Sequence, residues 1–537
     1  MHASSYTPSP FITFIDLKSG PKWGGLNNEG TILTLYGKRF GSSRGSSTVT
    51  VGGGRVAAYL LWSDTKIAVA IGSGANTGNV VVRTSGGTSN GWWFTVRPGN
   101  IYCVSTGGND AHRGRFPSSC WRTIVKAKNT MAAGDITYVL NGVTQTSLDG
   151  AKAALEITTS GTASMPIALV AYPGAKVSIG ILTWGNRSNP TRDGVHALYS
   201  KHWVIAGMFI QGIQAFDFTG NDQDWRVVAN EITCPNGSAE MARPYTADVG
   251  YEGYGCVVST NLSGFAFYGN YVFNTGTNCS AGLRINGGNG NDACKAYHAV
   301  YFSTDSDHID MAWNTIAPNG GCRALQFYST DGVDQYALSV HDNVIHNSVC
   351  DAVNFGTVNP SEGAVQAYDN VIYNAGQGPD PGGEFADYAC FYSADSTNAG
   401  GRGAGIIDVF NNTLYNCGAR RSYSSSGAFV KAGGDSSLTM RLRNNIAYQI
   451  PGENYLAGPA AQFTGTRNLW YGAGRAPDPA KLTYSLNVNP DFVDLAEYNF
   501  DLLPGSLAIR AGVFISGVVM NLNGMILSPS RPDIGAY

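Results

Sequence analysis

Three ionisable residues stand directly before three similar apolar segments of the chain. His298 precedes Ala-Val-Tyr-Phe, Arg323 precedes Ala-Leu-Gln-Phe and Asp351 precedes Ala-Val-Asn-Phe. If the three segments are neighbouring strands, an imidazole, a guanidinium and a carboxylate lie in one row. Such a row can bind a polar ligand, transfer protons and neutralise charge. The alternative is that these side chains only solvate an outer sheet, with Arg323 and Asp351 forming an exposed ion pair that contributes less than about 1 kcal/mol.

The segments belong to a repeat that is marked by asparagine. Six asparagines begin similar phrases, and they are Asn270, Asn314, Asn343, Asn370, Asn412 and Asn445. The tightest spacings between them are 27 and 29 residues. A short strand, a turn and an inward-facing asparagine, repeated in this way, predict a parallel β-solenoid, because each coil buries its apolar face only on its neighbours. The stacked amides would then satisfy buried turn backbone.

Side chains alternate across a strand, so the repeat also predicts an outward column. If Val300, Phe302 and their counterparts in the next coils point inward, the residues between them point outward. The column consists of Tyr301, Gln326, Asn354 and Tyr392, and we expect Tyr328 beside it. Aromatic rings stack on the apolar faces of sugars, while amides and charged groups bind the hydroxyls. The column therefore predicts a sugar-binding groove.

Two long insertions, after Asn274 and after Asn374, extend particular coils. In solenoids such insertions commonly gather on one face and wall a cleft. They carry further candidate side chains, namely Arg284, Asn286, Asp292, Lys295, Tyr297, Glu384 and Asp387.

Asp305 and Asp331 follow neighbouring strands and could lie close together on adjacent coils. Two adjacent carboxylates can act as an acid–base couple, bind Ca²⁺ or cap turns through their side chains. The pattern requires no cofactor, and Ca²⁺ is the metal that these carboxylates could hold.

The composition indicates a β-rich chain with many turns. Of 537 residues, 69 are glycine and 14% are charged, and the net charge is −3. This charge provides no basic surface for nucleic acid, and no apolar run reaches the roughly 18 residues of a membrane span. We expect a polysaccharide as the partner, with no nucleic acid and no membrane span, and a monomer as the default oligomeric state.

Ten cysteines, an even number, indicate disulfides. Their order along the chain gives five neighbouring pairs: Cys103 with Cys120, Cys234 with Cys256, Cys279 with Cys294, Cys322 with Cys350 and Cys390 with Cys417. One pair can be argued from geometry: Cys322 and Cys350 precede equivalent strands, so on adjacent coils they should lie about 4.8 Å apart. No Cys/His cluster has the spacing of zinc ligands. The first residues, Met1 to Tyr6, contain no signal peptide, and we expect an extracellular protein whose export signal has been removed.

Residues 1–98 differ from the rest of the chain. Short alternating segments, such as Ile32 to Tyr36 and Asn79 to Arg83, are separated by Gly, Ser and Asn turns, which predicts a small β-sandwich. The phrases Gly37-Lys-Arg-Phe-Gly41, Thr48-Val-Thr-Val-Gly-Gly53 and Ser89-Asn-Gly-Trp-Trp-Phe-Thr-Val96 closely resemble the IPT/TIG immunoglobulin-like domain. The resemblance implies a spacer or binding module without catalysis.

The rest of the chain resembles secreted polysaccharide-active proteins of the pectate-lyase-like superfamily. The resemblance rests on Ile101-Tyr-Cys-Val-Ser-Thr-Gly-Gly-Asn-Asp110 at the start and Arg531-Pro-Asp-Ile-Gly-Ala-Tyr537 at the end. It implies an all-β fold, a single-stranded right-handed parallel β-helix. Residues 99–134 would hold its first segment and a capping helix over 123–132, residues 135–470 the coils, and residues 471–537 a C-terminal cap. The resemblance specifies the fold better than the substrate.

Three functions fit these residues. In a polysaccharide lyase, which we favour, His298 or Lys295 is the base and Tyr301 the acid. Arg323, with Gln326 or Asn354, would neutralise a uronate carboxylate. The residues predicted to bind substrate are Gln326, Asn354, Tyr392, Tyr328, Arg284 and Glu384.

The second function is glycoside hydrolysis, in which Asp305, Asp331 or Asp351 would form the acid–base pair. The third is a non-catalytic glycan-binding rod. The chain lacks the paired-Asp signature of polygalacturonases and the calcium-binding Asp cluster of pectate lyases, which separates it from the better-known β-helix families. Convergence of the three ionisable residues in a walled cleft would favour an enzyme over a rod.

Overall fold

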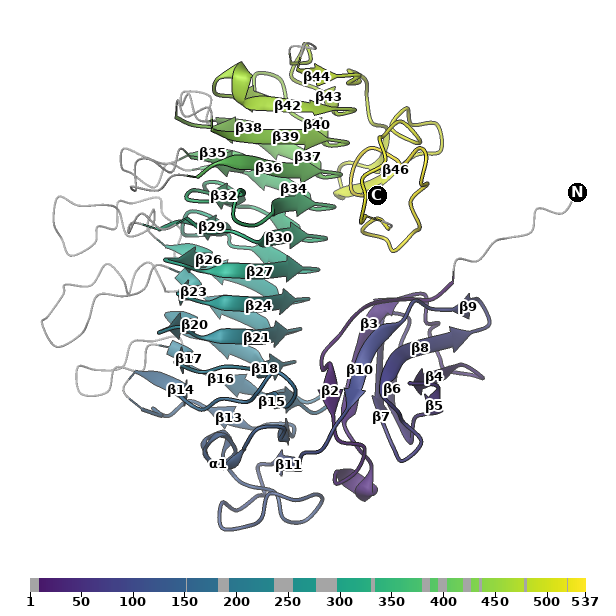
Figure 1. Ribbon diagram of the computed structural model, residues 1–537, viewed down its shortest axis with the longest axis vertical. Coiled ribbons are helices and arrows are strands. Elements are labelled where there is room, and N and C mark those ends of the chain that lie inside the picture. Colours follow the sequence, from purple (N-terminus) through teal and green to yellow (C-terminus); the bar gives the residue numbers. More distant parts are fainter. Residues whose placement is uncertain are drawn as a thin grey trace, which may run out of the picture.

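The computed structural model describes residues 9–150, 152–181, 193–235, 255–276, 297–329, 334–378, 387–394, 403–418, 426–433, 437–477, 481–518 and 520–537. Figure 1 shows a tall stack of β-coils with a small sandwich beside its first half. Among these residues the only α-helix is α1 (Ile124–Thr130), which begins where the Thr123 side chain accepts a hydrogen bond from the Lys126 backbone N–H. The predicted all-β fold is confirmed, and α1 lies within the span 123–132 in which a helix was predicted.

The N-terminal sandwich consists of two sheets packed face to face. The first contains β1 (Phe11–Ile15), β3 (Ile32–Lys38), β7 (Lys66–Ala70) and β6 (Ala58–Trp62). The second contains β2 (Ser19–Gly20), β10 (Trp92–Val96), β8 (Gly78–Thr84), β4 (Thr48–Val51) and β5 (Gly54–Arg55), with β9 (Gly87–Thr88) on β8. Buried and accessible residues alternate along β1 and β4, as expected of strands with one face in a core.

Three long sheets run the length of the coil stack. The thirteen-stranded sheet contains β11 (Ile101–Val104), β12 (Ile136–Val139), β15 (Ile167–Ala171), β18 (Trp203–Ala206), β21 (Gln223–Val228), β24 (Ser263–Tyr268), β27 (Asp307–Ala312), β30 (Leu338–His341), β33 (Val365–Tyr368), β36 (Gly405–Phe410), β39 (Leu438–Arg443), β42 (Phe463–Thr466) and β44 (Leu482–Thr483). The eleven-stranded sheet contains β13 (Thr144–Gln145), β16 (Ser178–Ile179), β19 (Phe209–Gln211), β22 (Glu231–Cys234), β25 (Tyr271–Thr275), β28 (Thr315–Ala317), β31 (Val344–His346), β34 (Val371–Ala375), β37 (Thr413–Cys417), β40 (Ile446–Tyr448) and β43 (Leu469–Tyr471).

The ten-stranded sheet contains β14 (Ala153–Ile157), β17 (Asp193–Leu198), β20 (Gln214–Thr219), β23 (Gly255–Thr260), β26 (His298–Ser303), β29 (Leu325–Phe327), β32 (Val353–Phe355), β35 (Tyr388–Ser393), β38 (Ser426–Lys431) and β41 (Leu456–Ala457). Equivalent residues of successive coils pair side by side, so Phe302, Phe327 and Phe355 stack in the core with ring centroids 5.2 and 5.7 Å apart. A hairpin of β45 (Phe492–Asp494) and β46 (Asn499–Leu502) lies in the C-terminal segment.

An asparagine ladder links the coils at the corner between the thirteen- and eleven-stranded sheets. From Asn270 onward, each Oδ1 accepts hydrogen bonds from the backbone N–H and from Nδ2 of the preceding ladder asparagine, as when Asn370 accepts from Asn343 at 3.1 and 3.0 Å. The ladder contains the six predicted asparagines and two more, Asn230 and Asn468, at its ends. All eight side chains are buried. The predicted ladder is confirmed and is longer than the sequence indicated.

Connection lengths differ sharply between the corners of the coils. From β21 to β43, each strand of the thirteen-stranded sheet is joined to the next strand of the eleven-stranded sheet by two residues, the second of which is the ladder asparagine. By contrast, β25 ends at Thr275 and β26 begins at His298, while β29 ends at Phe327 and β30 begins at Leu338. Insertions therefore occur at the two corners that border the ten-stranded sheet.

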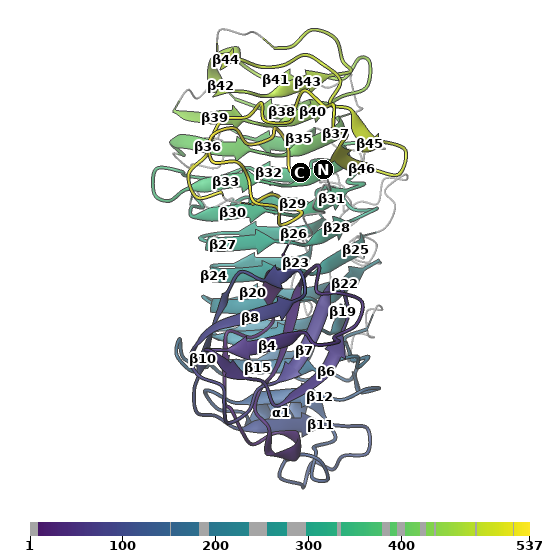
Figure 2. The same cartoon turned by 90° about the vertical axis from the view of Figure 1, so that its right-hand side faces the viewer.

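The sandwich and the C-terminal segment pack on the opposite side of the coils from the ten-stranded sheet (Figures 1 and 2). Phe14 of the sandwich lies 5.6 Å from Trp313 and 6.5 Å from Tyr268, measured between ring centroids. In the C-terminal segment, Tyr498 stacks on Tyr373 of the eleven-stranded sheet at 4.4 Å. These contacts bury outward-facing side chains of the β-helix.

Four of the five predicted disulfides are present: Cys103–Cys120, Cys234–Cys256, Cys322–Cys350 and Cys390–Cys417. The Cα atoms of Cys322 and Cys350 are 4.8 Å apart, the separation expected for adjacent coils.

The fifth predicted disulfide would join Cys279 and Cys294. Both Cys279 and Cys294 lie outside the described residues, in the connection between β25 and β26. The pairing of Cys279 with Cys294 therefore stays a prediction.

Candidate functional site

The outer face of the ten-stranded sheet carries a continuous column of polar and aromatic side chains. Strand register places Tyr301 beside Gln326, Gln326 beside Asn354 and Asn354 beside Tyr392. The residues on either side, such as Leu325 and Phe327, are fully buried in the core. The predicted order of the column is therefore confirmed, and its role in binding a substrate stays a prediction.

Arg323 is the centre of a buried hydrogen-bond network beneath this column. Its Nε donates to Asp351 Oδ2 at 3.0 Å and its Nη1 donates to Gln326 Oε1 at 3.1 Å. Its Nη2 donates to Asp387 Oδ2 at 3.4 Å, and Asn354 Nδ2 donates to Asp351 Oδ2 at 2.9 Å. The network joins three successive coils and fixes the amides of the column. The alternative prediction that Arg323 and Asp351 form an exposed ion pair is wrong. The two side chains do form an ion pair, but only 10% of the Arg323 side chain and none of the Asp351 side chain is exposed.

The strands start later than the sequence predicts, and this explains where the two charges lie. β29 begins at Leu325 and β32 at Val353, so Arg323 and Asp351 occupy the bend that precedes each strand. On a strand, alternation would direct both side chains into the apolar core with Leu325 and Val353. From the bend they instead reach Gln326 and Asn354, the outward residues three positions later.

Burial and charge set the protonation of the network. Burial raises the pKa of Asp351, while Arg323 and the amide of Asn354 act in the opposite direction. The pKa of Arg323 is raised, because the carboxylates of Asp351 and Asp387 outweigh its desolvation. Burial, with the Asp387 carboxylate, also raises the pKa of Tyr392 far above its ordinary value, so its phenol remains a proton donor at neutral pH.

His298 begins β26 and is buried beside the network. Its Nδ1 accepts the backbone N–H of Arg323 at 3.4 Å, which places the ring proton on Nε2. Burial and the neighbouring Arg323 lower its pKa well below the ordinary value, so the ring is neutral. Its ring stands edge-on to Tyr301 at 5.4 Å. This geometry fits a side chain that positions Tyr301 and Arg323 better than one that removes a proton from substrate.

The remaining predicted residues are distributed as follows. Asp305 occupies the turn after β26 with φ 54°, and Tyr328 follows β29 and is half-buried. Tyr297, taken as a groove residue, instead points into the core and donates its hydroxyl to the Ile213 carbonyl. In the part of the chain that is described, no group of three His, Cys, Asp or Glu side chains could hold a metal ion. Six predicted residues lie outside the described residues, and they are Arg284, Asn286, Asp292, Lys295, Asp331 and Glu384.

The structure adds an ionisable cluster on the same face that the sequence analysis missed. Register places Glu156, His196 and Asp217 side by side on β14, β17 and β20, in the same outward column. Lys152 Nζ lies 3.1 Å from Asp217 Oδ2, His196 Nδ1 lies 3.6 Å from Glu156 Oε2, and His196 Nε2 lies 2.9 Å from Thr219 Oγ1. Val258 of β23 separates this cluster from Tyr301.

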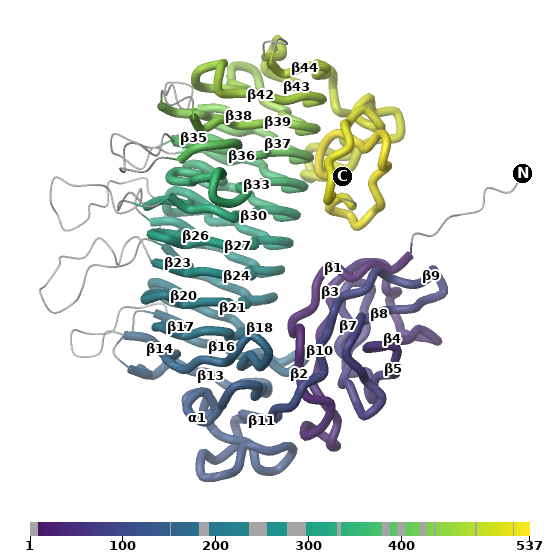
Figure 3. The backbone as a smooth tube through the Cα atoms, in the orientation of Figure 1, coloured from purple at the N-terminus to yellow at the C-terminus, as the bar shows by residue number. Residues whose placement is uncertain are grey.

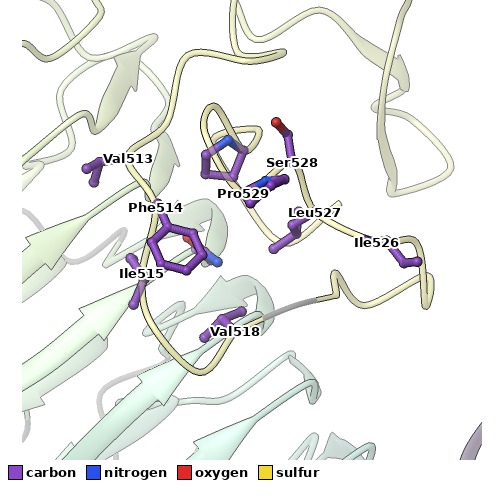
Figure 4. Close-up of a pocket in the computed structure, with 10 residues that line it drawn as sticks. Val513, Phe514, Ile515, Val518, Ile526, Leu527, Ser528 and Pro529 are labelled. Atoms are coloured by element: carbon purple, nitrogen blue, oxygen red, sulfur yellow. The ribbon is translucent and has the colours of Figure 1, made fainter. Parts of the chain in front are cut away.

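A second feature, an apolar pocket of about 170 Å³, lies in the C-terminal segment (Figure 4). It is lined by Asn411, Val513, Phe514, Ile515, Val518, Ile526, Leu527, Ser528, Pro529 and Pro532. None of these side chains is ionisable, so the pocket offers no group for acid–base chemistry.

Comparison with known proteins agrees with this architecture. Residues 10–96 match the IPT/TIG domain family. No curated protein matches the chain. The pectate lyase Pel9A has a similar structure, with a TM-score of 0.50 and 14% identity over 81% of this chain and 96% of the lyase.

Two further solved structures resemble the chain more weakly. The complex of XylC with xylose has a TM-score of 0.45 and 11% identity, covering 81% of this chain and 98% of XylC. A rhamnogalacturonan lyase has a TM-score of 0.38 and 15% identity, covering 75% of this chain and 94% of the lyase. At 14% identity, the similarity to Pel9A bears on fold and not on substrate. The chain thus consists of an IPT/TIG domain followed by a right-handed parallel β-helix, the fold of Pel9A.

Proposed function

We propose that the protein is an extracellular carbohydrate-active enzyme that cleaves a polysaccharide along the outer face of the ten-stranded sheet. The observation that carries this proposal is the coincidence, on one face, of the polar and aromatic column, two ionisable clusters and the corners that accept insertions. Four disulfides support an oxidising compartment. Among the residues that the structure describes, no helix is long and apolar enough to cross a membrane.

Elimination at a uronate is the first chemistry that we propose. It needs a base, a group that neutralises the uronate carboxylate and a proton donor. The Arg323 network brings one of each into contact: the Asp387 carboxylate, the Arg323 guanidinium and the Tyr392 phenol. Asp387 is the more accessible carboxylate of the network, with 16% of its side chain exposed, and is the group we assign to proton transfer.

Hydrolysis is the second candidate, and the charge balance of the network favours it. Arg323 is the one cation among the described groups in contact, and it pairs with two carboxylates. A site with this balance attracts an anionic uronate weakly. A neutral polysaccharide carries no carboxylates that the two carboxylates of the site could repel. In hydrolysis, the carboxylates of the network would serve as acid and base.

The test is incubation with uronate-containing and neutral polysaccharides while ultraviolet absorbance and new reducing ends are followed together. A rise in both signals supports elimination, and reducing ends alone support hydrolysis. Replacing Asp387 with Asn should lower the rate by on the order of a hundredfold or more. The matched control, Asp494→Asn on exposed β45, should retain the rate. An Asp387→Asn enzyme with full activity would refute this assignment, and no product from any substrate would refute the proposed function.

A further inference from the structure

A cleft of about 670 Å³ lies between the sandwich and the β-helix. Its sandwich wall includes Tyr36 and Lys66, which are neighbours on β3 and β7. Its β-helix wall includes Lys176, in the connection between β15 and β16, and Phe209 and Glu231, the first residues of β19 and β22. Figure 3 shows the sandwich beside the first half of the β-helix, away from the ten-stranded sheet. The cleft is therefore separate from the face described above.

Direct bonds between the two parts fix the width of the cleft. Arg226 Nη2 of β21 donates to the Ile15 carbonyl of the sandwich at 2.6 Å, and its Nε donates to the Asp16 carbonyl at 3.3 Å. The Tyr138 hydroxyl of β12 accepts from the Ile32 backbone N–H at 2.7 Å and donates to the Ile32 carbonyl at 2.9 Å. The cleft is thus formed before any ligand arrives, as small-molecule sites usually are.

Small residues keep the cleft open. Gly174, Ala206, Gly207 and Ala229 line its β-helix wall. A Cβ atom added at Gly174 would meet nothing within 4 Å, so the space beside it is empty. The β-helix wall thus combines these small residues with the longer side chains of Lys176, Phe209 and Glu231.

The ionisable groups of the cleft balance one another. Its lining contains two ammonium groups, Lys66 and Lys176, and two carboxyl groups, Asp16 and Glu231. Lys66 lies over the Tyr36 ring at 5.1 Å, while Lys176 and Glu231 are exposed at the rim. With no net charge, such a lining selects neither anions nor cations. Ammonium groups can donate to hydroxyl oxygens and carboxylates can accept from hydroxyls, and the half-buried Phe209 can stack on a sugar ring.

We infer that this cleft is a second, non-catalytic site that binds a short neutral oligosaccharide. The choice of a carbohydrate rests on the proposed function, whereas the cleft, its rigidity and its charge balance do not. A glycan strand held here would keep the enzyme on its polymer while the ten-stranded sheet acts elsewhere on that polymer. A polymer bound at one site is held near the other site, which raises the effective concentration of the polymer there.

The test measures calorimetric binding of short cello-, xylo-, manno- and galacto-oligosaccharides to the full chain. Ser178→Trp, on the outer side of β16, should fill the cleft and abolish one class of binding site. Lys66→Met should weaken that site by about tenfold or more, because it removes a charged hydrogen-bond donor. Lys481→Ala, an exposed lysine at the far end of the β-helix, is the matched control and should bind as the unaltered protein does.

Unchanged affinity in both cleft variants would overturn the inference, as would an unaltered protein that binds short peptides and none of these oligosaccharides. Cleavage of soluble polysaccharide by Ser178→Trp at the normal rate, with one binding class lost, would support it. Oligosaccharide binding that depends on the cleft, in a protein that cleaves nothing, would support the inference and refute the proposed function. The two ideas can thus fail separately.

Discussion

Replacing Asn343 with Leu tests whether the asparagine ladder stabilises the β-helix. The Asn343 side chain is fully buried, and its Nδ2 donates to the Met311 carbonyl at 2.9 Å. Its Oδ1 accepts the backbone N–H and Nδ2 of Asn314 at 3.0 and 2.9 Å. Leucine has a similar volume but can make none of these bonds, so their partners stay buried without them.

The expected loss follows from the groups that are left without partners. The substitution leaves the Met311 carbonyl and the Asn314 backbone N–H unsatisfied and removes one of the two acceptors of Asn314 Nδ2, which retains the Phe267 carbonyl. Each unsatisfied buried group costs about 1–3 kcal/mol. The free energy of unfolding should therefore fall by at least about 2 kcal/mol, with relaxation of the turn keeping the loss below the full sum of about 6 kcal/mol.

Urea unfolding followed by circular dichroism measures this loss, and hydrogen exchange at the Asn314 amide locates it. The matched control is Asn79→Leu, because Asn79 is exposed on β8 and its replacement should change stability by less than about 0.5 kcal/mol. Activity should persist in folded Asn343→Leu protein, since the ladder lies at the corner opposite the ten-stranded sheet. A loss below about 1 kcal/mol, or unchanged protection of the Asn314 amide, would refute the reasoning.

Two further perturbations test other contacts. Replacing Cys322 and Cys350 together with Ser opens a loop of 28 residues and should lower the free energy of unfolding by about 3–4 kcal/mol, so an unchanged urea midpoint would contradict a stabilising role. Burial alone would lower the pKa of His341, but hydrogen bonds to Asp310 and Asp342 raise it from 6.5 to about 9. A raised histidine pKa stabilises the fold fully below pH 6.5, and this contribution, about 3 kcal/mol, is lost as pH rises through 9. Urea midpoints across this range should fall more steeply in the unaltered protein than in His341→Gln, and parallel pH profiles would contradict the assignment.

The ladder, the outward column and the disulfide between adjacent coils could be predicted because each depends on one repeat distance. Once Asn343 and Asn370 are placed one coil apart, the register of Gln326 with Asn354 and the 4.8 Å separation of Cys322 and Cys350 follow from strand spacing. Tertiary context does not enter these arguments. They required only that the strands be parallel and in register.

The burial of the Arg323 network could not be predicted in the same way. Its position depends on a strand that starts one residue later than the apolar segment after Arg323 and on an ion pair with Asp387, 64 residues away. The cluster of Glu156, His196 and Asp217 was missed for a related reason. Glu156 and His196 are 40 residues apart, while His196 and Asp217 are 21 residues apart. A fixed repeat length therefore does not align these three residues.

The contact between the sandwich and the β-helix could have been predicted from outward aromatic residues in the sequence. Tyr268, the last residue of β24, and Trp313, in the turn after β27, are large aromatic residues on the outside of the β-helix, where polar residues are typical of a solvent-exposed surface. Both contact Phe14 of the sandwich. Outward aromatic residues that interrupt a polar pattern would therefore have predicted a covered surface.

The ladder also explains why the candidate site lies on the ten-stranded sheet. Each ladder asparagine must lie directly over the next, and this holds only while the corner between the thirteen- and eleven-stranded sheets contains two residues. In seven of the eight turns from β21 to β43, the first residue has a positive φ although it is not glycine. This backbone conformation costs free energy, which the hydrogen bonds of the ladder asparagine offset. An insertion at this corner would remove an amide from the stack and leave buried backbone unsatisfied. From β21 to β43, longer connections occur only at the other two corners, and both border the ten-stranded sheet. The asparagine ladder that stabilises the coils therefore confines the walls of any groove, and with them the candidate site, to the face of the ten-stranded sheet.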